Sequence, residues 1–511
     1  MVAEIEHVVV LALENRSFDH MLGFVEHPDP RFDGLLDGGP YTNLAAGNGE
    51  TVPATPDAKR VLPIDPDHSH QAMLEQLDGN AGFVRSYEKR GRGKPPGAWS
   101  GLLGPVVNLI ARLRHGRGPG GEKIKGRGPL IMRCQPPEHV AVLGTLATQF
   151  GTFSRWFCSV PGETWPNRNF LHAATSDGDT EIQPRFYTNK TIFEVLERAG
   201  AGWHVYFDDI PQVMAFIELW TRPQRLANWY AMDEFARHVE DGTLPAYSFI
   251  EPNHRPPVRL AAGHPSNSQH PGNALVPDGE YDAFQDDGTG DFARAETLLA
   301  HVYEVLRAHR EVFDKTVLLI TYDENGGFYD HVPAERGVAN PGTDPNPLTG
   351  FVRFLLHRKG KAFDFTMTGG RVPAVVVSPF VPPGSIGTET RDHASVPATL
   401  RALFAPAAEP LTARDAAAAR FDTLLTLPEP RRDLPDLSEH TAQPTTPLAA
   451  PAGATQEVPE HYEPYVQLAD KVTETLSQVN LASVSDRPSR ERADQLRTAF
   501  LNAAKLARTE I

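Results

Sequence analysis

Residues 318–331 read LLITYDENGGFYDH, and this stretch decides the fold class. Residues 316–321 form a short apolar, β-rich run of the kind that makes a buried strand, and Asp323, Glu324 and two glycines follow at once. Ligands of open α/β sheets gather beyond the carboxyl ends of the strands, and adjacent carboxylates repel each other unless a cation or a proton intervenes. The stretch therefore predicts a metal or catalytic site, or else a solvated turn, because Asp, Asn and Gly are also common in turns.

The first strand of the chain is predicted to end in the same way. Residues 5–13 (IEHVVVLAL) are largely apolar and rich in valine, as in a buried central strand, and Glu14 and Asn15 follow directly. Further strands are expected at residues 203–207, 247–250 and 371–378, and helices at residues 138–150, 191–199, 293–307 and 396–404. This alternation is typical of βαβ units and predicts an α/β fold.

The composition of the 511-residue chain is that of a globular protein with a formal net charge of -16. This charge argues against nucleic-acid binding, which needs a basic surface. The two cysteines, Cys134 and Cys158, are too few for a disulfide framework. Residues 1–10 lack the basic start of a secretory signal, and no run approaches the roughly 18 apolar residues that span a membrane. We therefore expect a cytoplasmic protein without a transmembrane segment, with export by a route that needs no signal left open.

Three stretches are predicted to depart from the α/β pattern. Residues 28–66, rich in Gly, Pro and Asp, read as a long excursion over the surface. Residues 91–128 include RLRHGRGPGGEKIKGRG and predict either a solvated insertion or a transient contact with an anionic membrane surface. We expect a catalytic domain at residues 1–404 that carries both excursions, followed at residues 405–511 by a Pro/Ala-rich wrap and a C-terminal helical extension.

Hydroxyl and imidazole groups occur in two further predicted loops. Thr164 lies in PGETWPNRNF, just before a helix-like stretch, where its hydroxyl is either an N-cap or part of a site. His68 and His70 close the first excursion, and they either face one site or are solvated.

Five motifs occur in an order that resembles a known family. They are ENRSFDH (14–20), PGETWPNR (161–168), SQHP (268–271) with DGE (278–280), YDENGGFYDHV (322–332) and DHAS (392–395). In order and spacing they resemble the bacterial phosphoesterase family of non-specific phospholipases C and related acid phosphatases. The resemblance implies an alkaline-phosphatase-like fold, which is a three-layer α/β/α sandwich with a central, mostly parallel sheet.

The resemblance also implies a metal site and a nucleophile. The implied metal ligands are Glu14, Asn15, Thr164, Asp323 and Glu324. Thr164 occupies the position at which the family carries its Ser or Thr nucleophile, so the intermediate would be a phosphothreonine. Oxygen ligands suit one divalent Mg, Mn, Ca or Fe ion and not a thiolate-type zinc site. Such an ion would lower the pKa of the Thr164 hydroxyl.

Histidines near the phosphate are implied as well. His270 matches one motif histidine, and His68 matches another better than its neighbour His70 does. A further family histidine has no clear counterpart, and His204 and His254 are both candidates. Two more histidines lie inside motifs, where we expect them to support loops more than to contact the ligand; they are His331 and His393.

The implied function is a metal-dependent phosphoric ester hydrolase of the phospholipase C type. It would cleave phospholipids such as phosphatidylcholine to diacylglycerol and a phosphorylated headgroup. The alternatives are an acid phosphatase that acts on small phosphomonoesters, and a protein that keeps the fold but only binds a phosphorylated ligand. These residues do not separate diester from monoester substrates, and they leave headgroup preference, the metal and the oligomeric state open.

Overall fold

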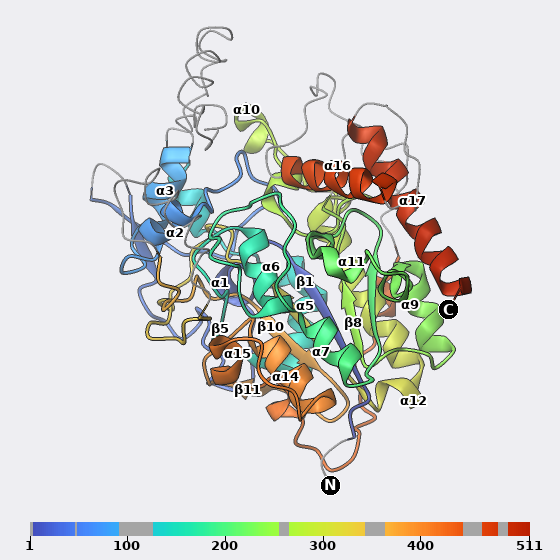
Figure 1. Cartoon of the computed structure of the whole chain (residues 1–511). Coiled ribbons are helices and arrows are strands. Elements are labelled where there is room, and N and C mark those ends of the chain that lie inside the picture. The colour runs from blue at the N-terminus through green and yellow to red at the C-terminus, as the bar shows by residue number, and fades with distance from the viewer. Residues whose placement is uncertain are drawn as a thin grey trace, which may run out of the picture.

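An eight-stranded sheet forms the centre of the protein (Figure 1). The computed structural model describes residues 4–45, 49–90, 126–254, 265–342, 363–442, 462–478 and 489–510. In spatial order the strands are β11 (Ser385–Gly387), β4 (Gly151–Phe153), β10 (Ala374–Val377), β9 (Thr316–Tyr322), β1 (His7–Leu13), β8 (Tyr247–Ile250), β6 (Trp203–Phe207) and β7 (Trp229–Ala231). Most of the basic excursion at residues 91–128 lies outside the described residues.

The sheet is mostly parallel, as predicted. β9, β1, β8, β6 and β7 follow one another in parallel, whereas β10 is antiparallel to both of its neighbours. β1 and β9 are buried almost throughout, because helices cover both faces of the sheet, and this explains their continuous apolar sequences.

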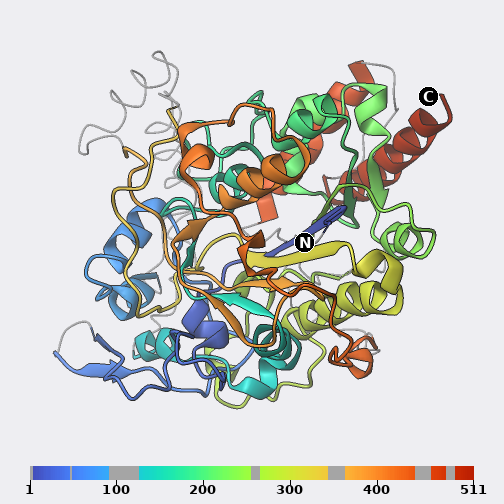
Figure 2. The same cartoon turned by 90° about the horizontal axis from the view of Figure 1, so that it is seen from below.

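Helices form a layer on each side of the sheet, which Figure 2 shows from below. One layer contains α6 (Thr164–Ala173), α7 (Ile192–Arg198), α14 (Ser395–Phe404) and α15 (Ala413–Ala417). The other contains α1 (Phe18–Leu22), α5 (Ala141–Gln149), α9 (Asp233–Glu240), α11 (Asp291–Ala308) and α12 (Arg310–Phe313). The predicted α/β/α sandwich is therefore confirmed.

The first excursion packs in a small hydrophobic cluster that it shares with other parts of the chain. It contains the hairpin of β2 (Thr42–Leu44) and β3 (Thr51–Pro53), and it is followed by α2 (His70–Gln76) and α3 (Phe83–Arg90). Phe83, Tyr87 and Val61 pack in one buried cluster with Phe328 and Tyr329 from the loop after β9. This cluster fastens the excursion to the carboxyl ends of the strands.

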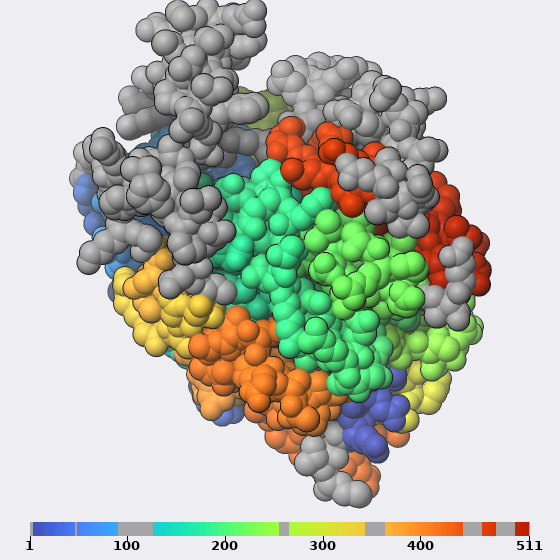
Figure 3. All heavy atoms as spheres, in the orientation of Figure 1, coloured from blue at the N-terminus to red at the C-terminus, as the bar shows by residue number. Residues whose placement is uncertain are grey.

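Two C-terminal helices pack against the sheet edge. α16 (Glu463–Gln478) contacts α17 (Ser489–Glu510), which lies on α8 (Pro223–Leu226) and β7. Phe500 of α17 packs edge-on against Trp229 with ring centroids 5.3 Å apart, and Figure 3 shows these helices against the green surface of the middle of the chain. Of the helices described, none combines the length and apolarity needed to cross a bilayer. The division of the chain at residue 404 stays a prediction.

Candidate active site

The carboxyl ends of two central strands bring the predicted acids together. β1 and β9 are parallel neighbours whose register pairs Leu13 with Tyr322, so Glu14 and Asp323 leave the sheet side by side. The backbone N–H of Asn15 donates to Asp323 Oδ1 over 3.0 Å, although 308 residues separate the two along the chain. The prediction that the two motifs meet at one edge of the sheet is thus confirmed in the fold.

The two loops that follow these strands touch through their backbones. Asn15 has a φ of 58° and Gly326 a φ of 62°, which is the left-handed region that Gly adopts freely and that Asn tolerates better than most residues. A Cβ atom on Gly326 would lie 2.1 Å from the Asn15 carbonyl oxygen. The close approach of the loops therefore requires glycine at position 326.

Thr164 lies beside Asn15 at the start of a helix. It is the first residue of α6, and the N-cap is Glu163, whose side chain makes no capping hydrogen bond. The buried Thr164 hydroxyl donates to Asn15 Oδ1 over 3.4 Å. The alternative that Thr164 is an N-cap is therefore wrong, and its hydroxyl faces the polar centre between β1 and β9.

The two carboxyl groups at the end of β9 are fully buried. Glu324 Oε1 is buried without a hydrogen-bond partner. Burial, and then the Asp323 carboxylate, raise the pKa of Glu324 well above its usual range. Burial also raises the pKa of Asp323 to about 6, with Glu14 adding to the rise and Arg168 opposing it. An oxygen-rich donor set with one unpartnered buried carboxylate oxygen fits a hard divalent cation.

Within the described residues, two groups of three side chains hold their ligand atoms within 4.8 Å of one another. They are Asp65, His68 and His270, and Asp19, Asp330 and His331. Neither group includes a predicted metal carboxylate. In the second group, Arg371 Nη2 donates to Asp19 Oδ1 over 2.7 Å and Nε donates to Asp330 Oδ1 over 3.0 Å. The second group is therefore an ion-pair network that joins the two motif loops.

Protein cations contact the predicted metal carboxylates. Arg168 Nε donates to Asp323 Oδ2 over 2.9 Å, and Nη1 donates to Glu251 Oε1 over 2.9 Å. His254 Nδ1 lies 2.9 Å from Glu14 Oε2, and Nε2 lies 2.9 Å from Glu251 Oε1. Burial alone would lower the pKa of His254, but the two carboxylates raise it to about 9. Sequence reasoning assigned no role to Arg168 or Glu251, although Glu251 follows β8 just as Glu14 follows β1.

Hydrogen bonds orient the rings of His68 and His270. His270 Nδ1 accepts the backbone N–H of Gly272 over 2.9 Å, and its Nε2 lies 3.1 Å from Nδ2 of Asn15. His68 Nδ1 lies 3.0 Å from the Pro66 carbonyl oxygen, which can only accept, so Nδ1 carries a proton. His68 Nε2 remains available for proton exchange. The two rings meet edge-on with centroids 5.7 Å apart.

The other candidate histidines lie in different surroundings. His254 contacts Glu14, whereas His204 lies among Tyr206, Tyr230 and His238 on the β6–β7 side of the sheet. His70 donates through Nδ1 to the Pro161 carbonyl oxygen, in the loop before α6.

His331 and His393, the two histidines expected to support loops, each use both ring nitrogens for contacts within the protein. His393 Nε2 donates to the Asp323 carbonyl oxygen over 2.6 Å, and Nδ1 accepts Trp156 Nε1–H over 3.3 Å. His331 contacts Asp19 and Asp33 with its two nitrogens. Neither ring has a nitrogen left for a phosphate, which agrees with the expected role as loop supports.

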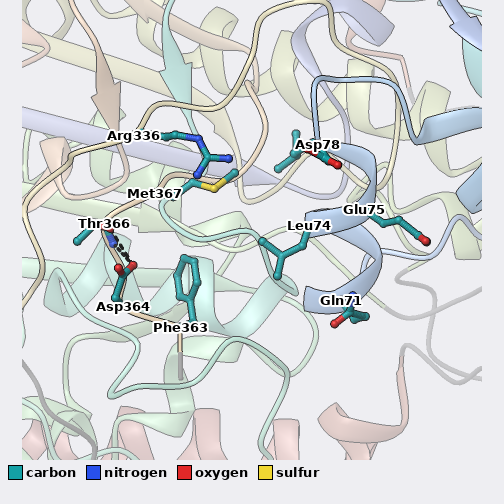
Figure 4. A pocket seen from close by; sticks show the side chains of 10 residues that line it. Gln71, Leu74, Glu75, Asp78, Arg336, Phe363, Asp364, Thr366 and Met367 are labelled. Atoms are coloured by element: carbon teal, nitrogen blue, oxygen red, sulfur yellow. Dashed lines mark hydrogen bonds between the residues drawn. The ribbon is translucent and has the colours of Figure 1, made fainter. Parts of the chain in front are cut away.

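A pocket lies next to His70. A pocket of about 490 Å³ separates α2 from residues 363–367. Figure 4 shows Leu74 and Asp78 on one side and Phe363 and Met367 on the other. The ring of His70, the first residue of α2, packs edge-on against Phe363 at 5.0 Å. The pocket thus adjoins the site through His70 and contains none of the predicted catalytic or metal residues.

Comparisons with known proteins show the family of the chain. A family model described as Phosphoesterase family matches residues 5–405. Non-specific phospholipase C6 of Arabidopsis thaliana is 32% identical over 468 residues, which cover 88% of this chain and 76% of that protein. Phospholipase C B of Mycobacterium tuberculosis is 26% identical over 515 residues, covering 90% and 86%. A solved structure of an alkaline phosphatase superfamily protein from Vibrio parahaemolyticus covers 52% of this chain and 60% of its own, with 12% identity and a TM-score of 0.29.

Fold and site define an α/β enzyme with a buried, oxygen-rich centre at the carboxyl ends of its strands. The chain belongs to the Phosphoesterase family, as its motifs predicted. It is a phosphoric ester hydrolase.

Proposed function

We propose that the chain is a metal-dependent phospholipase C with Thr164 as its nucleophile. It would cleave phospholipids such as phosphatidylcholine to diacylglycerol and a phosphorylated headgroup. The observation that carries the proposal is the buried Thr164 hydroxyl, which donates to Asn15 at the meeting point of β1 and β9. The names of the relatives, non-specific phospholipase C6 and phospholipase C B, support the substrate class.

The proposed first step is displacement at phosphorus. Thr164 Oγ attacks, its proton passes to solvent, and the bond from phosphorus to the glycerol oxygen breaks. That oxygen takes a proton from His68 Nε2, which the Nδ1 hydrogen bond to Pro66 leaves free to exchange protons. His270 donates through Nε2–H to a non-bridging oxygen, and the N-terminus of α6 adds its partial positive charge.

The second step restores the enzyme. Water attacks phosphorus while His68 takes up its proton, and the bond to Thr164 Oγ breaks to release the phosphorylated headgroup. Thr164 recovers a proton from solvent.

Asn15, Asp323 and Glu324, together with Glu14 and Thr164, are the residues that would hold a divalent cation. The orphaned Glu324 Oε1 and the raised pKa of its carboxyl are the features that support such an ion. When bound, it would make the Thr164 hydroxyl more acidic and neutralise charge on the phosphate.

A substrate panel tests the proposal. Purified protein is assayed on phosphatidylcholine, sphingomyelin and a nitrophenyl phosphate monoester, each with and without a chelator. We expect release of phosphocholine from phosphatidylcholine that the chelator abolishes and an added divalent metal restores. Turnover of the monoester alone would favour the acid phosphatase, and the absence of any turnover would favour the ligand-binding alternative.

A further inference from the structure

We infer that Glu251 is the centre of a positioning network that holds Glu14 and Asp323 in the geometry a divalent cation needs. Glu251 reaches Glu14 through His254 and reaches Asp323 through Arg168. The inference rests on the proposed function, because it takes Glu14 and Asp323 as ligands of a cation.

Three donors converge on one oxygen of Glu251. Arg168 Nη1 and His254 Nε2 each lie 2.9 Å from Glu251 Oε1, and the backbone N–H of Gln212 donates to it over 3.2 Å. Glu251, Arg168 and His254 are all buried. A buried carboxylate with three donors has little freedom to move, so it fixes the two side chains that bind it.

Those two side chains lead to the two strands of the site. His254 Nδ1 contacts Glu14 Oε2 at the end of β1, and Arg168 Nε contacts Asp323 Oδ2 at the end of β9. Arg168 Nη2 also donates to the carbonyl oxygen of Ala12 over 2.9 Å, which ties it to the backbone of β1. One carboxylate just after β8 is therefore linked to the acids that follow its neighbour β1 and the next strand, β9.

Glu251 acts on the site through these two partners. It contacts Arg168 and His254, which in turn contact Asp323 and Glu14.

Glu251→Gln tests the network, because glutamine keeps the shape and one acceptor oxygen but removes the charge. The full-length protein is stripped with chelator, and Mn²⁺ alone is titrated by calorimetry, with thermal unfolding measured alongside. We expect Mn²⁺ to bind Glu251→Gln about 10 to 100 times more weakly than the wild type. His254→Gln, which alters the link to Glu14 alone, should weaken binding in the same direction and serves if Glu251→Gln does not fold.

Glu194→Gln is the matched control. Glu194 is a buried glutamate of α7 whose Oε1 lies 3.4 Å from Arg225 Nη1, so its substitution also breaks a buried ion pair. It should lower the Tm and leave Mn²⁺ affinity unchanged. Wild-type affinity in a folded Glu251→Gln protein would overturn the network while the proposed function stands. If the wild type itself bound no Mn²⁺, Mg²⁺, Ca²⁺ or Fe²⁺, the metal dependence and the network would both be overturned.

Discussion

The hydroxyl of Tyr465 donates to Glu14 Oε1 over 3.3 Å, although 451 residues separate the two along the chain. The ring of Tyr465 also stacks on His254, with centroids 4.6 Å apart and planes 21° apart. Tyr465 is buried, and so is Glu14. The C-terminal helix α16 thus forms part of the wall around a predicted metal ligand, in a region outside the five motifs.

Tyr465→Phe should therefore affect the site more than the fold. The substitution keeps the ring stack and removes one hydrogen bond, which contributes about 1 kcal/mol to stability. We expect a reduction of several-fold in kcat on phosphatidylcholine with a small change in Tm. Tyr462→Phe is the control, since the Tyr462 hydroxyl donates to Asp209 and not to Glu14. Equal activity of the two variants would show that the contact with Glu14 is not needed.

Thr164→Ala should fold normally and lose several orders of magnitude in rate, because no neighbouring group replaces the nucleophile. Thr164→Ser should keep part of the activity, since its hydroxyl can take the same position. Mass spectrometry of enzyme quenched during turnover should find phosphate on the peptide that contains residue 164. Thr399→Ala, which removes another buried hydroxyl, in α14, is the control for folding. A fully active Thr164→Ala protein refutes the assignment.

His68→Ala and His270→Ala should lower turnover while the metal stays bound. Pro66 and Gly272 contact Nδ1 of the two rings, and the proposal assigns the phosphate chemistry to Nε2 of each. Metal content is measured by elemental analysis after gel filtration, and kcat on phosphatidylcholine is measured in parallel. His204→Ala should change neither quantity, because His204 lies in an aromatic cluster away from these residues. Loss of metal from either test variant would mean that these histidines are ligands.

Glu324→Gln should have opposite effects on stability with and without metal. Burial and Asp323 raise the pKa of Glu324, so ionisation of this group costs the metal-free protein stability as the pH rises above its unfolded value, about 4.5. In chelator at pH 7, Glu324→Gln should therefore have a higher Tm than the wild type. This difference in Tm should become smaller as the pH is lowered toward 4.5. With saturating divalent metal the wild type should be the more stable protein. A lower Tm of the variant in both conditions would contradict the role of Glu324.

His331 should stabilise the fold in a pH-dependent way. Burial alone would lower its pKa, but Asp19 and Asp33 raise it to about 10. Because the pKa of His331 is raised, its contribution to the free energy of unfolding is fully present below its pKa in the unfolded chain, about 6.5. This contribution is lost as the pH rises through about 10. The free energy of unfolding of the wild type relative to His331→Gln, measured with urea, should thus shrink between pH 6.5 and pH 10. The corresponding difference for His204→Gln should stay constant, because burial lowers the pKa of His204 to about 3.

Much of the sheet could be predicted from local sequence. The strands expected at residues 203–207 and 247–250 are β6 and β8, and the strand expected at residues 316–321 is β9, one residue longer. Strands buried on both faces consist almost wholly of apolar residues, so an uninterrupted apolar run in the sequence marks their position. The helix expected at residues 138–150 divides into a 3-10 turn and α5, and the short strands β4 and β11 were not expected, because three residues are too few for a periodic pattern.

The sequence by itself determined that Glu14, Asn15, Asp323 and Glu324 follow two buried strands, since this is a property of neighbouring residues. Only the tertiary structure decided which strands are neighbours in space. The order β9, β1, β8, β6 places the end of β8 next to Glu14, which brings His254 into contact with Glu14 and adds Glu251. Tyr465 reaches the site because α16 packs beside it, and such packing depends on side chains distant in the chain that local periodicity does not encode.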